Sequence, residues 1–164
     1  GIMHPTSGTG TINDMLLFSS NYEYRKYLIY WSHHPQFYSS LTGYENIKLF
    51  LNLRSESNKI KFINDYAIKY ELNNHINKKI SEYSFGQIQR LKLIQLSISN
   101  WDLAVLDEPH SGIDDQGKVM LDKMLIDRKN KGKTIFIISH NKNWLLKNSN
   151  KIFYIKNSKL THND

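Results

Sequence analysis

The chain has 164 residues, a net charge of +7 and no cysteine. This length suits one domain with a hydrophobic core, and the lack of cysteine excludes disulfides and thiolate metal ligands within the sequence. No apolar run reaches the roughly 18 residues that a membrane-spanning helix needs. The first ten residues, GIMHPTSGTG, lack the basic and apolar segments of a secretory signal, so none is expected.

The positive charge has several interpretations. Basic proteins often bind nucleic acid, and an anionic membrane surface also attracts them. Here 18 lysines are scattered along the chain against four arginines, and no basic cluster is interleaved with aromatic residues. We therefore expect a compositional bias rather than a nucleic-acid partner.

The first third of the chain indicates short β elements. Residues 5–14 contain proline and glycine and predict a turn that leads into a β segment. Residues 27–31, YLIYW, predict a strand because aromatic and β-branched residues dominate them. A loop over residues 32–35 follows.

Residues 42–81 predict a helical block. Thr42 and Glu45 have the spacing of a capping box at the start of a helix with an apolar face. Apolar residues then recur at helical spacing between positions 60 and 70, and the asparagines at 73–74 are expected to end that second helix.

The remainder alternates helices with strands. The expected elements are a helix that begins at Ser84, a buried strand over 103–106, a helix over 116–129 closed by Gly132, a buried strand over 134–138, a short helix over 143–147 and a terminal hairpin over 152–160 that turns at Asn157 and Ser158. This alternation indicates an α/β fold with a largely parallel sheet. Ligands in such folds gather at the carboxyl ends of the strands.

Two carboxylates, Asp107 and Glu108, stand at one predicted strand end. One carboxylate suits Mg²⁺, and a second, one residue on, can polarise an attacking water. The alternative for the pair alone is an acidic residue that caps the next helix. Function is favoured because four apolar residues precede the pair and Pro109 with the turn 111–114, SGID, follows it.

Two weaker signals accompany the carboxylates. Residues 84–87, with Gly86 at a helix start, present free N–H groups that favour an anion, although an ordinary serine N-cap explains them equally well. His140 follows a predicted strand and could contact a phosphate or an attacking water. His33 and His34 have the same two interpretations, functional or surface loop.

Together these residues resemble the nucleotide-binding subunit of an ABC transporter. The matching segments are YSFGQ at 83–87 for the signature usually written LSGGQ, with Tyr and Phe as departures; 103–107 for the Walker B strand; Glu108 for the catalytic carboxylate; 111–114 for the D-loop; His140 for the switch histidine; and 41–47 for the start of the helical subdomain. Their order along the chain is that of the family.

The resemblance implies an α/β fold with a P-loop NTPase-like (RecA-like) parallel sheet core, a helical subdomain at 42–81 and an antiparallel β segment, all within one ATP-binding domain over 1–164. It implies ATP and Mg²⁺ as ligands. Asp107 would hold Mg²⁺ through water, and Glu108 and His140 would be catalytic. The implied nucleotide-binding residues are Ser84, Phe85, Gly86, Gln87, His33, Ser111 and Asp114.

The implied partners are a second ATP-binding subunit, joined head to tail, and an integral membrane permease contacted by residues 42–81. The chain would then lie on the inner face of a bacterial or mitochondrial inner membrane. His33, two residues before Pro35 where relatives have a glutamine, and the run 113–117, IDDQG, resemble the haem exporter ATPase of cytochrome c maturation. Another ABC exporter, or a catalytically dead basic binding module, are the alternatives.

The phosphate-binding loop of the family, G-x-x-x-x-G-K-[ST], is not found in the sequence. Gly132-Lys133-Thr134 is the nearest match, but Asp127 occupies the first glycine position and the run precedes a strand where the loop should follow one. We therefore expect an N-terminally truncated domain that binds ATP weakly by itself and leaves one side of its sheet poorly covered. A partial sequence, a split gene or a decayed gene would each explain this.

Overall fold

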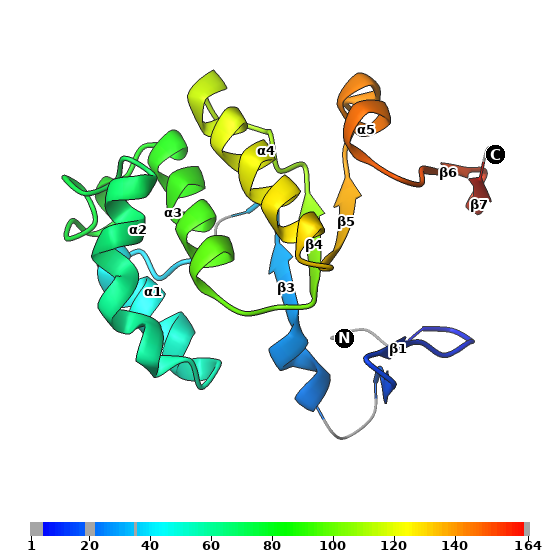
Figure 1. The fold of residues 1–164 in the computed structure, drawn as a ribbon, viewed down its shortest axis with the longest axis horizontal. Coiled ribbons are helices and arrows are strands. Elements are labelled where there is room, and N and C mark those ends of the chain that lie inside the picture. The colour runs from blue at the N-terminus through cyan, green and yellow to red at the C-terminus, as the bar shows by residue number, and fades with distance from the viewer. Residues whose placement is uncertain (1–4, 19–21, 35, 163–164) are drawn as a thin grey trace.

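The computed structural model describes residues 5–18, 22–34 and 36–162 (Figure 1). A parallel sheet lies at its centre, in the order β3 (Leu28–Trp31), β4 (Leu103–Asp107) and β5 (Thr134–Ile138). The predicted parallel arrangement is therefore confirmed for these three strands. Consecutive strands are connected through helices, as parallel pairing requires.

The helices of the described residues are α1 (Gly43–Leu53), α2 (Ile63–Lys69), α3 (Phe85–Ile98), α4 (Asp115–Asn130) and α5 (Lys142–Asn148), with short 3-10 helices η1 (Glu23–Tyr27), η2 (Ser57–Phe62) and η3 (Ile80–Glu82). Figure 1 shows α1, α2 and α3 grouped on one side, with α4 between them and the β5 end of the sheet. Antiparallel pairs form the two ends, β1 (Thr11–Ile12) with β2 (Met15–Leu16) and β6 (Phe153–Lys156) with β7 (Lys159–His162).

Two caps fix where α1 and α3 begin: the capping box predicted at Thr42, and one at Ser84, for which an ordinary serine N-cap was the alternative interpretation. The Thr42 hydroxyl accepts the N–H of Glu45, and the Glu45 carboxylate accepts the N–H of Thr42. Ser84 and Gln87 make the same reciprocal pair at the start of α3. Each cap satisfies two backbone donors that a helix would otherwise leave unpaired.

The second helix of the block ends earlier than predicted. Residues 57–62 form the 3-10 helix η2, and α2 ends at Lys69 rather than at 73–74. Glu71 takes a left-handed φ of 54°. The N–H of Leu72 then donates to the carbonyl of Ala67, as in a Schellman turn. The left-handed residue ends the helix, and the turn directs Leu72 into the core, where it is fully buried.

The sheet has one covered and one open face. Ile29, Ala104 and Leu106 lie on the covered face and are buried in the main core. Tyr30 is 47% exposed on the other face, and Phe136 and Ile138 of β5 are 52% and 48% exposed. Poor cover on one side was expected, but the prediction that β5 is a buried strand is wrong. It is an edge strand with alternate residues on the open face.

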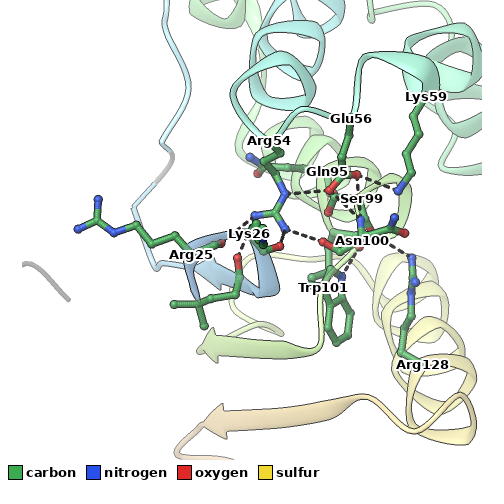
Figure 2. Close-up of polar contacts among 12 residues, drawn as sticks. Arg25, Lys26, Arg54, Glu56, Lys59, Gln95, Ser99, Asn100, Trp101 and Arg128 are labelled. Carbon is green, nitrogen blue, oxygen red and sulfur yellow. Dashed lines mark hydrogen bonds and ion pairs between the residues drawn. The ribbon is translucent and has the colours of Figure 1, made fainter. Parts of the chain in front are cut away.

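Arg54, directly after α1, fastens the helices to the sheet (Figure 2). Its guanidinium donates to the carbonyls of Lys26, Leu28 and Asn100, and its Nε to Glu56 at 3.2 Å. Glu56 also accepts the N–H of Asn100. These bonds join the entry to β3, the entry to β4 and the end of α1 at one point.

Candidate functional site

Polar residues meet at the carboxyl end of the sheet, where parallel strands place their ends together. Asp107 is the last residue of β4 and pairs with Ile138, the last residue of β5. Glu108 follows the first strand, and Ser139 with His140 follows the second. Three of the predicted residues, Asp107, Glu108 and His140, are therefore neighbours in the fold.

Glu108 is held firmly by the segment after β5. Its N–H donates to the carbonyl of Ile138, and its carboxylate accepts the N–H of His140 at 2.6 Å and the Ser139 hydroxyl at 3.2 Å. Its φ is 44°, a conformation that a side chain with a Cβ rarely adopts. The three hydrogen bonds offset that strain, so the backbone can turn sharply at Glu108.

The His140 imidazole is fully exposed, and its Nε2 lies 3.9 Å from the Glu108 carboxylate. No other packing restrains the exposed ring in the described residues, so it is accessible from the strand ends. Its backbone has a separate task, because the His140 N–H orients the carboxylate.

Asp107 differs from Glu108 in having a free carboxylate. It is half-buried and makes no hydrogen bond with any residue that the structure describes. By strand alternation it shares the open face with Val105. One uncommitted carboxylate fits the small share of a Mg²⁺ shell that proteins usually provide. Within the described ranges no three acidic, histidine or cysteine side chains gather as a complete metal site.

The 111–114 turn is built into the start of α4. Asp114 caps that helix by accepting the N–H of Gly117 at 2.8 Å, and its other oxygen pairs with Arg90 at 2.9 Å. Arg90, together with the helix N–H, lowers the pKa of Asp114. The Ser111 N–H donates to the carbonyl of Glu108. The nucleotide-binding roles of Ser111 and Asp114 stay predictions, and Asp114 already has a structural one.

The signature segment lies against this turn. Gly112 has a φ of 69°, and a Cβ there would overlap the ring of Phe85. Phe85 is 46% exposed, so its other side is open to solvent. Nothing lies within 4 Å of a Cβ built on Gly86, which leaves the start of α3 accessible. The aromatic departure from the family signature thus has a local partner, the 111–114 turn.

His33 lies apart from the carboxylates. It is exposed, its ring contacts that of His34, and within the described ranges no hydrogen bond or ion pair joins it to Asp107, Glu108 or His140. Pro35, used in the narrower resemblance, lies outside the described residues. The role of His33 stays a prediction.

Lys92 positions the loop that carries His33, and it was not foreseen. Its ammonium donates to the carbonyl of Ser32 at 2.8 Å, and burial lowers its pKa to about 8. The sequence signal that could have identified Lys92 is its place between Leu91 and Leu93, where a buried helix face would otherwise be apolar. The helix α3 thus carries the signature at one end and holds the 32–34 loop near its middle.

His110 was also not foreseen. Its Nε2 lies 3.0 Å from Asp122 Oδ1 of α4, and Trp144 of α5 donates its indole N–H to the same oxygen at 3.1 Å. The two rings are 4.1 Å apart. This cluster binds the turn after β4 to the two helices that follow it, which steadies the strand end carrying Glu108.

Comparison with known proteins gives a consistent result. A family model described as ABC transporter matches residues 1–111. The chain is 34% identical over 146 residues to the bacitracin transport ATP-binding protein BcrA of Enterococcus faecalis, covering 83% of this chain and 44% of that protein. It is 29% identical over 118 residues to the cytochrome c biogenesis ATP-binding export protein CcmA of Aliivibrio fischeri, covering 72% and 57%.

A solved structure of an ATP-binding subunit of an ABC transporter superposes with a TM-score of 0.89 at 21% identity, covering 99% of this chain and 70% of that one. This confirms the P-loop NTPase-like fold. The chain spans less than half the length of the bacitracin relative. Of the helices that the structure describes, none is long and apolar enough to cross a membrane. On the family match over residues 1–111, the chain belongs to the ABC transporter family.

Proposed function

We propose that this chain is the ATP-hydrolysing subunit of an ABC exporter and that it supplies the catalytic carboxylate and the nucleotide-capping signature. The main support is that Asp107, Glu108 and His140 lie together at the carboxyl end of a parallel sheet. They adjoin the 111–114 turn, which packs against Phe85 of the signature segment. That edge is where α/β folds bind their ligands.

Each residue has a task in this proposal. Asp107 offers its free carboxylate to water in the Mg²⁺ shell, and Glu108 orients and polarises the attacking water. His140 contacts the terminal phosphate, while its N–H fixes the Glu108 carboxylate. Mg²⁺ would contribute charge neutralisation of the phosphates. Residues 84–87 cap a nucleotide held by a second subunit, with the open N-terminus of α3 facing the phosphates.

The phosphate cradle itself is proposed to come from outside these 164 residues. Two observations support this: the sequence has no G-x-x-x-x-G-K-[ST] run, and the sheet face that carries Asp107 is apolar and uncovered. A strand and helix that cover Tyr30, Phe136 and Ile138 would bring a phosphate-binding loop to the strand ends. Such a segment can belong to the same polypeptide or to another.

The test joins the chain, at its N-terminus, to a strand–loop–helix unit that carries the G-x-x-x-x-G-K-[ST] sequence. We expect Mg²⁺-dependent phosphate release by the joined protein and none by the chain alone. Glu108→Gln should lower the rate by about 100-fold or more while ATP affinity changes little. Asp65→Asn, an equal charge change on the exposed side of α2, should leave the rate unchanged.

Three results would contradict the proposal. Equal rates for Glu108→Gln and Asp65→Asn would remove the catalytic role of Glu108. Micromolar Mg·ATP affinity of the chain alone, measured by calorimetry, would show that no external cradle is needed. Salt-dependent nucleic-acid binding with no effect of ATP would instead favour the basic binding module.

For the partners we propose an integral membrane permease, contacted by the helical subdomain at 42–81, and a second ATP-binding subunit. For the cargo we propose a role in cytochrome c maturation, supported by His33 at the glutamine position and by the CcmA relative. In a bacterium lacking its own maturation ATPase, the joined protein should restore haem-stained cytochrome c, and its Glu108→Gln variant should not. An active ATPase that fails to restore it would assign the chain to another exporter.

A further inference from the structure

A cavity lies away from Asp107 and Glu108, on the helical side of the sheet. It has a volume of about 630 Å³ and is bounded by η2, α2, the end of α3 and α4. That volume falls in the range of about 300–1,000 Å³ usual for small-molecule sites. The end of the cavity at Ser97 and Ile98 lies about 20 Å along α3 from the signature, at about 1.5 Å per residue, whereas its Tyr70 side is linked through Arg90 to Asp114. None of the residues that line the cavity belongs to the proposed ATP site, and nothing inferred for it rests on that proposal.

The lining is strongly basic. It contains five cationic side chains and a single carboxylate, that of Asp127. Three of the cations are already engaged. Lys59 pairs with Glu56 (Figure 2), and Lys131 pairs with Asp127; the two nitrogen–oxygen distances are both 2.8 Å. Arg128 donates to the carbonyls of Ser97 and Ser99 at the end of α3.

Lys69 and Lys123 are left over. In the described part of the chain neither has a carboxylate at ion-pair distance. The Lys69 ammonium instead lies 5.7 and 5.4 Å from the ring centroids of Tyr66 and Tyr70. Asp127, the one acidic group of the lining, has its pKa lowered chiefly by Lys131, with smaller contributions from Arg128 and Lys69. An anion in the cavity would relieve the repulsion among these cations.

The floor of the cavity is apolar and partly aromatic. Tyr66 and Tyr70 stack at 6.5 Å with an angle of 18° between their planes, and the Tyr70 hydroxyl bonds to that of Ser97. Phe62 lines the cavity while 42% exposed, and Met120 and Met124 complete the surface. Flat rings and soft methionine side chains favour a flat apolar body over a hydrated ion.

We propose that this cavity binds an anionic small molecule with an aromatic body, of the aryl phosphate class. The ammonium groups of Lys69 and Lys123 bind the phosphate by charge-assisted hydrogen bonds. The ring system lies over the Phe62 and Tyr66 side of the floor. The phosphate and the ring system should both contribute to binding, because the cations and the apolar floor line the same open cavity.

The test uses three probes on the full chain, observed by saturation-transfer NMR and calorimetry at about 0.1 M salt, where exposed charges more than about 10 Å from the ligand are largely screened. The probes are 4-methylumbelliferyl phosphate, 4-methylumbelliferone and inorganic phosphate. We expect the aryl phosphate to bind at least about 10-fold more tightly than either half, which corresponds to about 1.4 kcal/mol. Saturable binding in the high micromolar range would support the site.

Matched variants localise the binding. Lys69→Met and Lys123→Glu, both exposed positions, should each weaken aryl phosphate binding by about 5-fold or more. Lys48→Glu, on the exposed side of α1 and outside the cavity, should change it by less than about 2-fold because its charge is screened. Adding Mg·ATP should not displace the probe.

Four outcomes would overturn the proposal. Equal affinity for inorganic phosphate would mean a general basic surface, and equal affinity for 4-methylumbelliferone would mean an apolar patch. Equal losses in Lys123→Glu and Lys48→Glu would place the binding elsewhere. No binding at millimolar probe would remove the site. None of these results bears on the ATPase proposal, which is tested by phosphate release with Glu108→Gln.

Discussion

Replacing Arg54 by alanine should destabilise the fold severely, because one side chain holds three segments together. The change removes the donor to the carbonyls of Lys26, Leu28 and Asn100 and one partner of the Glu56 carboxylate (Figure 2). Arg54 is only 10% exposed, so solvent screens these interactions weakly.

The size of the effect follows from the bonds that are lost. Hydrogen bonds to charged groups contribute about 1.5–3 kcal/mol each, and breaking a buried ion pair costs about 3–5 kcal/mol. Two effects reduce this cost. Water that enters the vacated space would hydrate some of the three carbonyls, and Glu56 still has hydrogen bonds from Lys59 and from the N–H of Asn100. We expect a loss of about 3 kcal/mol, or about 10 °C in melting temperature for a chain of this size.

Urea unfolding followed by far-UV circular dichroism measures this free energy. Arg54→Lys keeps the charge but lacks the planar fork, so it should recover only about 1 kcal/mol of the loss. The control is Arg25→Ala, which removes an exposed guanidinium lying over Tyr22 and should cost less than about 0.5 kcal/mol. If the free energy of unfolding of Arg54→Ala lay within about 1 kcal/mol of that of the native chain, the hydrogen bonds of Arg54 would not be what joins the helices to the sheet.

Two further predictions concern stability. Because burial lowers the folded-state pKa of Lys92 to about 8, below the unfolded value of about 10.4, the unfolded chain binds more protons between these values and stability rises with pH there. Relative to Lys92→Met, the native chain should gain about 2 kcal/mol between pH 7 and 9.5 in urea titrations; a constant difference would exclude a depressed pKa. Gly112→Ala should lower the melting temperature, costing about 1–3 kcal/mol through its left-handed φ and the overlap with Phe85. Phe85→Ala should relieve part of that cost, and an unchanged loss in the double variant would refute the contact.

Features specified within one turn of chain could be predicted from the sequence. The caps at Thr42 and Ser84 depend on residues three positions apart, and the terminal turn at Asn157 and Ser158 depends on two residues that both tolerate a positive φ. The order of strands and helices followed from apolar periodicity, and the neighbourhood of Asp107 and His140 followed from parallel strands. Each inference needed only local rules and one topological rule.

What escaped prediction depends on contacts between distant segments. Arg54 reaches Asn100, Lys92 reaches Ser32, and His110 reaches Asp122, and none of these pairs shares a local pattern. The early end of α2 escaped because Glu71, a residue with no turn signature, takes the left-handed conformation that glycine usually fills. Leu72 packing into the core, a tertiary effect, overrides that preference.

The free carboxylate of Asp107 lies on the open face of the sheet. In the proposed enzyme, the covering of that face is therefore coupled to nucleotide binding. A segment that covers Phe136 and Ile138 removes apolar surface from water, worth about 25 cal/mol per Å². The same segment would place N–H groups that bind phosphate near Asp107. Nucleotide binding and the covering of the open sheet face should therefore stabilise each other. Mg·ATP would then raise the melting temperature of the joined protein and leave that of the chain alone unchanged. Glu108 needs no such completion, because Ser139 and His140 already fix its carboxylate.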